Sequence, residues 1–331
     1  MSGTDLNPGR LLEMSGYYWQ TCTLHAGVKL NVFTLIGEDA YTGAAVAQQL
    51  SGDADGVTRL LNALAAMGLL TKSDDRFSNS ELAKTFLSKD SPQYIGFMIM
   101  HHYHLVESWH KLDEAVVSGK AVRGRMSFSD PEYRESFLMG MFNLAMGLAP
   151  KLVPKIELSG KHRLLDLGGG PGTYAIHFCR HNPDLKATVF DLPTTEPFAK
   201  KTIARFDLSD RIDFVGGDYL KDDIPGTYDV VWLSHILHGE GSEDCRKLVK
   251  KAASVLNPGG FIIIHEFILN NHHDGPVFPA IFSLNMLLGT EKGRAYSEQE
   301  LSGMMTEAGA KKIRRISVET PNDSGILLGE I

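Results

Sequence analysis

Cysteine is scarce in this chain of 331 residues, and the three that occur are Cys22, Cys179 and Cys245. An odd number of widely separated cysteines excludes a disulfide framework, and without a C-x-x-C pair there is no sign of structural zinc. Basic residues are also in the minority, because 33 Lys and Arg face 40 Asp and Glu, which gives a net charge of −7. Without a polybasic tail, binding to nucleic acid is not expected.

The sequence lacks a run of about 20 uncharged apolar residues, the length that a membrane-spanning helix requires. Its N-terminus, MSGTDLNPGRLLEMSGYYWQ, lacks the apolar stretch of a secretory signal peptide. Together with the few cysteines, these absences predict a cytoplasmic protein without membrane insertion. Hydrophobic residues nevertheless make up 43% of the chain, which is enough apolar material for two or three domain cores.

Residues 8–35 have the composition of a helix whose apolar side chains are spread over several faces. A helix that is apolar on several faces must be buried on several faces. Two interpretations remain open: the helix packs against a second subunit, or it covers its own domain.

Residues 39–87 predict a winged-helix module, in which two short helices are followed by two strands around a polar turn. Thr42 is the candidate N-cap of the first helix, and Gly68 is the candidate C-cap of the second. The second helix would read DNA, but Arg59 is its only basic residue, whereas a DNA-reading helix needs several. A packing role is therefore favoured, and a non-catalytic DNA-binding regulator is kept as an alternative.

Residues 91–153 predict two long helices that are rich in methionine and aromatic residues. Such side chains usually belong to a core, but they can also line an adaptable apolar pocket, because methionine fills irregular space. The candidate pocket residues, two of which come from a later segment, are Tyr103, Trp109, Met139, Phe142, Met146, Asn285 and Met286.

From Lys161 onward, short apolar runs alternate with helical segments, which predicts a parallel sheet with helices on both faces. The last two runs, KKIRRISVE and GILLGEI, predict a closing antiparallel hairpin. A long segment without an assigned element separates the strand GFIIIHEFIL from the helix SEQELSGMMTEAG. The expected divisions are an N-terminal domain at 1–100, a helical linker contributing to the substrate pocket at 101–155, and an α/β domain at 156–331.

A glycine-rich turn follows the first strand of the predicted α/β domain, where Arg163–Leu167 runs into GGGPGT. Such a turn lets a ligand reach backbone N–H groups at a helix N-terminus. The dinucleotide fingerprint would need glycine at Thr173, and the lysine of a phosphate-binding loop is absent. The loop therefore favours a nucleoside ligand without a pyrophosphate.

Two acidic residues at strand ends make this pattern more specific. Asp191 ends the second strand, 25 residues after Asp166, where a carboxylate can accept hydrogen bonds from both ribose hydroxyls. Asp218 ends the third strand, where it can meet an adenine edge.

The segments LLDLGGGPGTYAIHF, VFDLP, GDYL, LSHILHGEGSEDCRKLVKKAASVLNPGG and IIIHEFIL resemble the plant caffeic-acid and bacterial small-molecule O-methyltransferase family. This resemblance implies a winged-helix dimerisation domain followed by a Rossmann-like methyltransferase domain with a mostly parallel seven-stranded sheet. It also implies a homodimer that uses S-adenosyl-L-methionine and releases S-adenosyl-L-homocysteine. The expected cofactor-binding residues are Asp166, Gly168, Gly170, Gly172, Asp191, Leu192, Asp218, Tyr219 and Ser234.

The candidate catalytic pair is His238, after the fourth strand, and Glu266, on the fifth. Methyl transfer to a phenol needs a base, because a phenol with a pKa of about 10 is mostly protonated at neutral pH. A histidine can take that proton, and a carboxylate on its other ring nitrogen would fix the tautomer. The family resemblance implies these roles, because a histidine base is followed 28 residues later by a supporting glutamate, as here.

Three features depart from the family or compete with this pair. The Asp-Trp that usually follows the base is Gly239-Glu240 in this chain. A second supporting glutamate is ambiguous, although Glu291 is a candidate, and His235 is a rival base. The acceptor is expected to be a small aromatic or polycyclic hydroxyl compound, and a carbon or nitrogen acceptor, such as a tetrapyrrole or another secondary metabolite, is the alternative.

Histidine-rich segments at 101–104 and 265–274 raise the question of a metal. They contain neither an H-E-x-x-H motif nor a cysteine partner, and the acidic residues that hold Mg²⁺ in metal-dependent catechol methyltransferases are absent after the fourth strand. A mechanism without metal is therefore expected.

Overall fold

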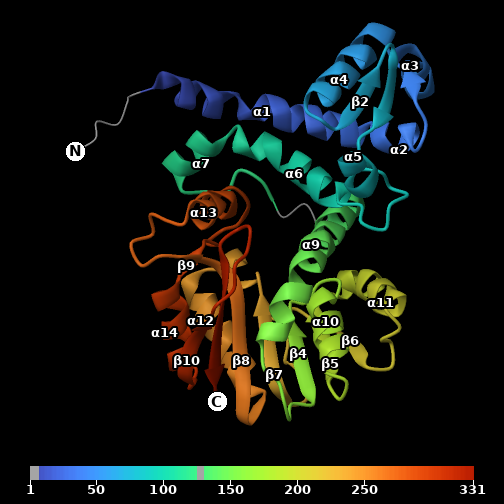
Figure 1. Cartoon of the computed structure of the whole chain (residues 1–331). Coiled ribbons are helices and arrows are strands. Elements are labelled where there is room, and N and C mark those ends of the chain that lie inside the picture. The colour runs from blue at the N-terminus through green and yellow to red at the C-terminus, as the bar shows by residue number, and fades with distance from the viewer. Residues whose placement is uncertain (1–6, 125–129) are drawn as a thin grey trace. The chain divides into compact units, whose positions relative to one another are not determined.

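The computed structural model describes residues 7–124 and 130–331. The chain divides into two compact units, Met1–Leu105 and Val106–Ile331, and each is described by itself. Figure 1 shows the elements of both units.

The first unit combines helices with a small sheet. A three-stranded antiparallel sheet in the order β1-β3-β2 packs with the helices around Phe33, Leu61, Leu64 and Phe77. The Thr42 hydroxyl accepts a hydrogen bond from the Ala45 N–H and begins α3, as expected. The elements are α1 (Pro8–Lys29), α2 (Val32–Ile36), β1 (Tyr41–Thr42), α3 (Gly43–Leu50), α4 (Ala54–Ala66), β2 (Leu70–Ser73), β3 (Arg76–Asn79) and α5 (Glu81–Phe86).

The first helix ends sooner than the composition predicts. Asn31 adopts a left-handed conformation with φ of 55°, which breaks the expected helix at 8–35 into α1 and α2. Asparagine tolerates this conformation better than most residues, so the break is local chemistry that an apolar pattern does not reveal. The first half of α1 also exposes large apolar side chains, namely Leu11, Leu12, Met14, Tyr17, Tyr18 and Trp19.

Two helices replace the single helix expected over residues 91–119. These are α6 (Gly96–Trp109), which crosses the division between the units, and α7 (Leu112–Ser118). The second long helix is α9 (Pro131–Leu152), which begins at the N-cap Asp130 and continues into the short 3-10 turn η1 (Val153–Lys155).

Helix α9 with its extension, Pro131–Lys155, is long and apolar enough to cross a membrane by length and composition alone. A run of about 20 uncharged apolar residues is nevertheless absent here, because Glu135 and Lys151 bound the uncharged part of this helix at residues 136–150. Core helices of globular proteins meet the same criterion, and α9 packs against α10, with Ala149 and Leu152 in the core of the second unit. Packing inside the unit therefore accounts for these buried apolar side chains of α9.

The second unit is built on a mostly parallel sheet with the strand order β10-β11-β8-β7-β4-β5-β6, and β9 pairs with β8. The last two strands form the expected antiparallel hairpin. The elements are β4 (Arg163–Leu167), α10 (Thr173–His181), β5 (Lys186–Asp191), η2 (Pro193–Thr195), α11 (Glu196–Arg205), β6 (Ile212–Gly216), β7 (Tyr228–Ser234), η3 (Leu237–Gly239), α12 (Ser242–Ser254), β8 (Leu256–Leu269), α13 (Val277–Gly289), β9 (Tyr296–Ser297), α14 (Glu298–Glu307), β10 (Lys311–Ile316) and β11 (Ser324–Glu330).

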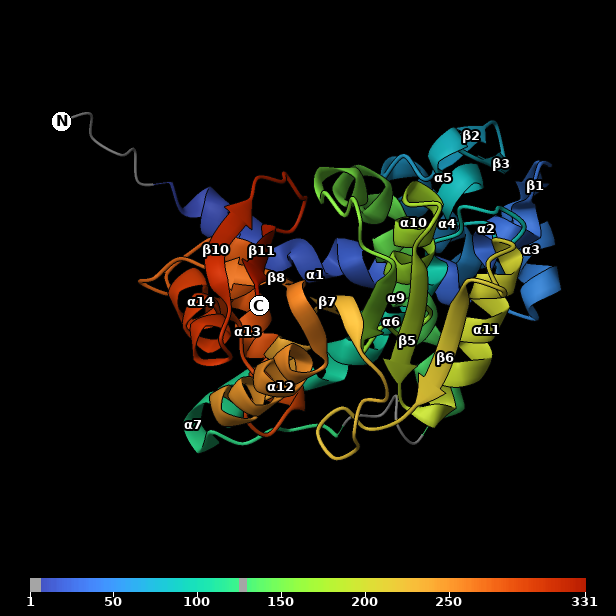
Figure 2. The same ribbon diagram turned by 90° about the horizontal axis from the view of Figure 1, so that it is seen from below.

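Helices cover both faces of this sheet. Helices α10 and α11 lie on one face, and α12 and α14 lie on the other (Figure 2). The central strands are therefore buried on both sides, which explains why they read as continuous apolar runs instead of alternating ones. Trp232 on β7 is completely buried. Polar chemistry is thereby concentrated at the ends of the strands.

The connection from β4 to α10 depends on glycine. Gly168, Gly170 and Gly172 have φ of 67°, 55° and 77°, which side chains other than glycine rarely adopt. At Gly168 a Cβ atom would also lie only 2.6 Å from the Ile236 Cγ2 atom. At Gly170 a Cβ atom would meet nothing within 4 Å, so this part of the loop faces open space.

Asp166 lies beneath this loop with only 1% of its surface exposed. Its carboxyl group accepts a hydrogen bond from the Ala175 N–H in the first turn of α10, at 3.1 Å. Burial raises the pKa of Asp166 to about 7, against the pull of that hydrogen bond and with a further rise from Asp191. The side chain supports the loop from below and does not reach its open side.

The raised pKa of Asp166 predicts how stability depends on pH. Between about pH 4 and 7 the folded state holds a proton that the unfolded state has lost, so stability falls as pH rises through this window and is level above it. Asp166→Asn retains the oxygen that faces Ala175 and cannot titrate. As pH increases from about 4 to 7, the free energy of unfolding of Asp166→Asn minus that of the wild type should therefore rise by roughly 2–4 kcal/mol.

Urea unfolding monitored by circular dichroism at several pH values measures this difference. Asp210→Asn, at an exposed carboxyl, is the matched control. A difference between Asp166→Asn and the wild type that does not change between pH 4 and 7 would contradict the prediction.

Candidate active site

The candidate site lies at the carboxyl ends of β4, β5, β7 and β8. These four strands are parallel neighbours, and their registers pair Leu167 with Phe190 and Leu233, and Ser234 with His265. In open α/β sheets this edge carries the ligand-binding crevice. The structure therefore brings the glycine loop and the ends of β5, β7 and β8 to the same edge.

Asp191 anchors the nucleoside half of the site. One carboxylate oxygen accepts the Gly170 N–H at 2.8 Å, and the other accepts the Leu192 N–H at 2.7 Å and the Thr195 hydroxyl at 3.0 Å. Burial raises the pKa of Asp191 although these hydrogen bonds oppose the rise. A carboxylate has about four acceptor positions, so one remains for a ligand hydroxyl.

A nearby hydroxyl also lacks a partner. Thr173 begins α10 with 3% of its surface exposed, and its buried Oγ1 atom makes no hydrogen bond within the described part of the chain. The open side of the loop at Gly170, this hydroxyl and the free position on Asp191 are suited to a polar, hydroxyl-bearing ligand such as the ribose of S-adenosylmethionine. The residues present thus fit the cofactor that the sequence implies.

Asp218 and Tyr219 follow β6 and point to partners within the protein. The Asp218 carboxylate accepts hydrogen bonds from the Leu220 N–H at 3.0 Å and Lys221 Nζ at 2.8 Å. Burial raises the pKa of Asp218, but these bonds outweigh burial and hold it below its usual value. Exposed ion pairs contribute at most about 1 kcal/mol, so a ligand could displace Lys221 at little cost. The Tyr219 hydroxyl donates to Glu240 at 3.1 Å.

Ser234 belongs to a buried polar chain. Its hydroxyl lies 2.9 Å from His265 Nδ1, and the other ring nitrogen of His265 lies 3.1 Å from the Ser324 hydroxyl. Burial lowers the pKa of His265 well below its usual value, so the ring is neutral and bridges two hydroxyls. His265 therefore joins β7, β8 and β11 inside the sheet.

His238 and Glu266 meet at the centre of this edge. His238 lies on η3, and its Nδ1 atom is 2.8 Å from Glu266 Oε2. The Glu266 side chain is 3% exposed and that of His238 is 14% exposed. Glu266 also accepts the backbone N–H groups of Leu237 at 2.9 Å, His238 at 3.3 Å and Phe267 at 3.2 Å.

These contacts determine the tautomer of His238. Burial alone raises the pKa of Glu266, but interactions with His238 and His235 outweigh burial and hold it far below its usual value. An ionised carboxylate only accepts hydrogen bonds, so the Nδ1 atom of His238 must carry the hydrogen. In a neutral ring the Nε2 atom then keeps its lone pair. The geometry thus presents one basic nitrogen at the end of β7.

His235 lies beside this pair without joining it. Its Nδ1 atom is 3.6 Å from Glu266 Oε2, and this buried nitrogen has no hydrogen bond among the described residues. Burial lowers the pKa of His235, although Glu266 opposes the shift. The backbone is left-handed at His235, with φ of 55°, and its N–H donates to the His265 carbonyl at 2.9 Å.

An aromatic wall that the sequence analysis missed surrounds His238. The ring of Phe282 stands edge-on to His238 with a centroid distance of 4.8 Å, and Phe267 is nearly parallel to His238 at 5.8 Å. Phe278 extends the wall, 5.0 Å from Phe267. Phe278 and Phe282 lie on α13, the helix within the segment to which no element was assigned. The signal for that helix was its length of continuous apolar sequence bounded by Pro276 and Gly289.

The candidate pocket residues fall into separate groups. Asn285 and Met286 lie buried on α13, which packs against β8 and η3, and Asn285 Oδ1 accepts a hydrogen bond from Arg123 at 3.2 Å. On α9, Phe142 is buried and Met139 and Met146 are half-buried.

Four candidates differ in their surroundings. Tyr103 belongs to the first unit, where its hydroxyl meets Lys29. Trp109, at the end of α6, is half-buried. Glu291 is exposed. Met146 faces away toward α10, because its sulfur lies 3.3 Å from His177 Nε2.

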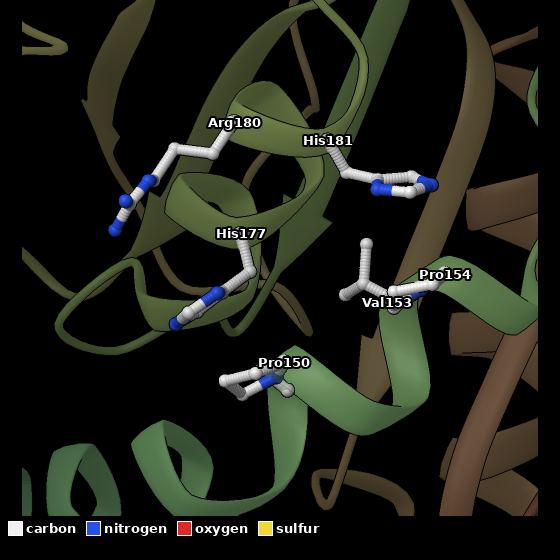
Figure 3. Close-up of a pocket in the computed structure, with 7 residues that line it drawn as sticks. Pro150, Val153, Pro154, His177, Arg180 and His181 are labelled. Atoms are coloured by element: carbon white, nitrogen blue, oxygen red, sulfur yellow. The ribbon is translucent and has the colours of Figure 1, made fainter.

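A small cavity of about 180 Å³ lies at the other end of α10. His177 and His181 point from that helix toward the bend at Pro150, Val153 and Pro154, while Arg180 extends away (Figure 3). Helices that connect parallel strands run back across the sheet, so the last turn of α10 lies at the edge opposite His238. This cavity is therefore not part of the candidate site.

Comparison with known proteins identifies the family of this chain. The model of the O-methyltransferase domain matches residues 109–311, and that of the O-methyltransferase dimerisation domain matches residues 12–89. Among curated proteins, 3-hydroxy-5-methyl-1-naphthoate 3-O-methyltransferase of Streptomyces sahachiroi is 31% identical, covering 97% of this chain and 95% of that protein. L-tyrosine C(3)-methyltransferase of Streptomyces lavendulae is also 31% identical, covering 90% and 87%.

A solved structure agrees over nearly the whole chain. PigF, an S-adenosyl-L-methionine-dependent methyl transferase of Serratia, has a structure with SAH that superimposes with a TM-score of 0.90 at 26% identity, covering 98% of this chain and all of that one. The domain match spans well over half of this chain, and its fold is the one described above. The chain therefore belongs to the O-methyltransferase family and is an S-adenosylmethionine-dependent methyltransferase.

Proposed function

We propose that this enzyme methylates a hydroxyl group of a small aromatic or polycyclic acceptor, with His238 as the general base and Glu266 as its positioning residue. The observation that carries the proposal is the 2.8 Å contact between His238 Nδ1 and the ionised, buried Glu266 carboxylate. This contact leaves the Nε2 atom of His238 as the nitrogen that can accept a proton.

The cofactor would be held by the glycine loop and the end of β5. The loop offers backbone N–H groups at the N-terminus of α10, and Asp191 offers its free acceptor position to the ribose. Leu192, Asp218 and Tyr219 would border the adenine, with Lys221 displaced from Asp218. Asp166 and Ser234 would act indirectly, through the loop and through His265. When bound, S-adenosylmethionine supplies a methyl group on a positively charged sulfur.

His238 would remove the acceptor proton as the oxygen attacks. The hydroxyl donates its hydrogen bond to Nε2, which aims an oxygen lone pair at the methyl group, and the proton passes to Nε2 during the transfer. The imidazolium formed in this step is stabilised by Glu266 Oε2 at 2.8 Å. Because Glu266 is ionised beforehand, no reorganisation of charge is needed in the protein.

The aromatic wall supports an aromatic acceptor. Phe267 and Phe282 present a ring face and a ring edge to His238, and Phe278 packs against both of these phenylalanines. Offset and edge-to-face contacts between rings contribute about 0.5–1.5 kcal/mol each beyond burial. The naphthoate methyltransferase relative is named for an acceptor of this kind. Another relative is named for methylation of a tyrosine carbon, so a carbon acceptor is the second candidate. The position of the transferred methyl group in the product distinguishes methylation of oxygen from methylation of carbon.

The cofactor proposal predicts selective binding. Calorimetric titration should give micromolar affinity for S-adenosylhomocysteine and none for NAD, because the loop lacks the third glycine of the dinucleotide fingerprint. Asp191→Asn should weaken S-adenosylhomocysteine binding by about 10-fold or more, because the amide is a poorer acceptor than the carboxylate. Asp210→Asn is the control, and equal affinities for all three proteins would refute the role of Asp191.

The base proposal predicts a separation of chemistry from binding. His238→Gln should lower the rate of methyl transfer to hydroxynaphthoic acids by about 10²–10⁴-fold, because general base catalysis is lost. Calorimetry should show its affinity for S-adenosylhomocysteine within about threefold of the wild type. His272→Gln, at an exposed histidine, controls for the substitution itself. Turnover by His238→Gln at the wild-type rate would exclude His238 as the base.

The exposed apolar side chains of α1 lead us to propose a homodimer, in agreement with the dimerisation-domain match. Light scattering at micromolar concentration should give twice the mass of the chain. Trp19→Asp combined with Leu12→Asp should shift the protein toward the monomer, because the charges would oppose burial of α1. Leu82→Asp, at an exposed leucine on α5, should leave the mass unchanged. A monomer mass for the wild type would exclude the proposal.

A further inference from the structure

Three potential metal-binding atoms converge at the carboxyl end of the sheet. His235, His238 and Glu266 each contribute one ligand atom, and these three atoms lie within 4.8 Å of one another. The Nδ1 atoms of the two histidines lie 3.6 and 2.8 Å from the same oxygen, Oε2 of Glu266. Two imidazoles and one carboxylate form a donor set that binds Zn²⁺ in catalytic sites, where three protein ligands leave a fourth position open.

His235 is the residue that the methyl-transfer mechanism does not use. Its ring packs between His265 and Phe267, each with a centroid distance of 4.3 Å, and its Nδ1 atom is buried without a hydrogen bond in the described part of the protein. A buried nitrogen without a partner normally costs stability. A metal ion in front of Nδ1 would supply that partner.

We propose that His235, His238 and Glu266 form an inhibitory site for Zn²⁺. Tetrahedral zinc with ligands at about 2.0–2.2 Å holds neighbouring ligand atoms about 3.3–3.6 Å apart. The Nδ1 atoms of the two histidines lie 3.6 and 2.8 Å from Glu266 Oε2, and all three donor atoms lie within 4.8 Å of one another, so the two imidazole rings must shift to reach this spacing. Water or the acceptor oxygen would complete the coordination.

The surroundings favour zinc over harder cations. The second oxygen of Glu266 keeps its hydrogen bonds from the N–H groups of Leu237 and His238 and so fixes the carboxylate. Phe267 and Phe282 flank the site and keep its polarity low. Mg²⁺ and Ca²⁺ prefer sets of oxygen ligands, whereas the group formed by the described residues contains two imidazoles and one carboxylate.

Inhibition follows from the position of one hydrogen. In the metal-free enzyme Nδ1 of His238 carries the hydrogen and Nε2 carries the lone pair. Zinc binds through the Nδ1 lone pair, so the hydrogen of the neutral ring moves to Nε2. The nitrogen that would accept the acceptor proton then becomes a donor, and no net proton is released from His238. This account of inhibition rests on the proposed base, whereas zinc binding itself does not.

Calorimetric titration of the tag-free full chain with ZnCl₂ tests the site. The wild type should bind Zn²⁺ and ignore MgCl₂, and His235→Asn should weaken Zn²⁺ binding on the order of 100-fold, since loss of even a second-shell partner costs 10–100-fold. Asparagine tolerates the left-handed backbone of this position, and thermal unfolding by circular dichroism checks the fold. His272→Asn, at an exposed histidine, is the matched control and should bind like the wild type.

Cobalt gives a second readout that is independent of turnover. Co²⁺ in a four-coordinate site absorbs visible light much more strongly than in six-coordinate water, and this absorption should appear in the wild type and be lost in His235→Asn. Equal Zn²⁺ affinity in the wild type and His235→Asn, or a Co²⁺ spectrum like that in water, would overturn the proposal.

Methyl transfer to hydroxynaphthoic acids, measured for each protein against its own metal-free rate, should be inhibited by Zn²⁺ in the wild type and not in His235→Asn. If His238→Gln retains turnover while zinc binding depends on His235, the proposed base fails and the metal site stands.

Discussion

The buried negative charge of Glu266 constrains the whole carboxyl edge of the sheet. Removing a carboxylate from water costs several kcal/mol unless hydrogen bonds replace the water. Three backbone N–H groups and His238 Nδ1 supply this replacement. Two of these N–H groups belong to η3, so the turn that carries His238 is folded around the carboxylate. The position and tautomer of the proposed base thus follow from the solvation of one side chain.

The other three acidic residues at this edge, Asp166, Asp191 and Asp218, are stabilised in different ways. Among the described residues, no cation contributes to the pKa of Asp166, and burial raises that pKa to about 7, so the side chain keeps its proton up to about this pH. Asp191 is likewise buried, but three hydrogen bonds oppose the rise of its pKa. Asp218, nearer the surface, pairs with Lys221. The sheet therefore places a neutral, a hydrogen-bonded and an ion-paired carboxyl group around one crevice. Asp191 accepts an N–H group of the glycine loop and keeps a free acceptor position.

Much of this arrangement could be predicted from sequence, because strand ends and spacing carry it. The alternation of apolar runs predicted the sheet, and the neighbouring strand ends together with the family resemblance predicted the pair of His238 and Glu266, which the structure brings to 2.8 Å. Helix α13 escaped prediction, since VFPAIFSLNMLLG is apolar on all sides and shows no stripe. The aromatic wall was not predicted either, because Phe278 and Phe282 lie on this helix. The partners of Asp218 depend on a turn that no periodic pattern encodes, and the functional roles of all these residues remain proposals.

The close approach of Gly168 and Ile236 links the loop proposed for the cofactor to the segment that leads to the proposed base. A single added carbon at Gly168 would lie 2.6 Å from the isoleucine side chain, so the loop proposed for the cofactor and the segment leading to the base are in van der Waals contact. Variation at one position is therefore constrained by the other, and the two should co-evolve. Chimeras that exchange acceptor-binding segments between relatives need to carry both residues together.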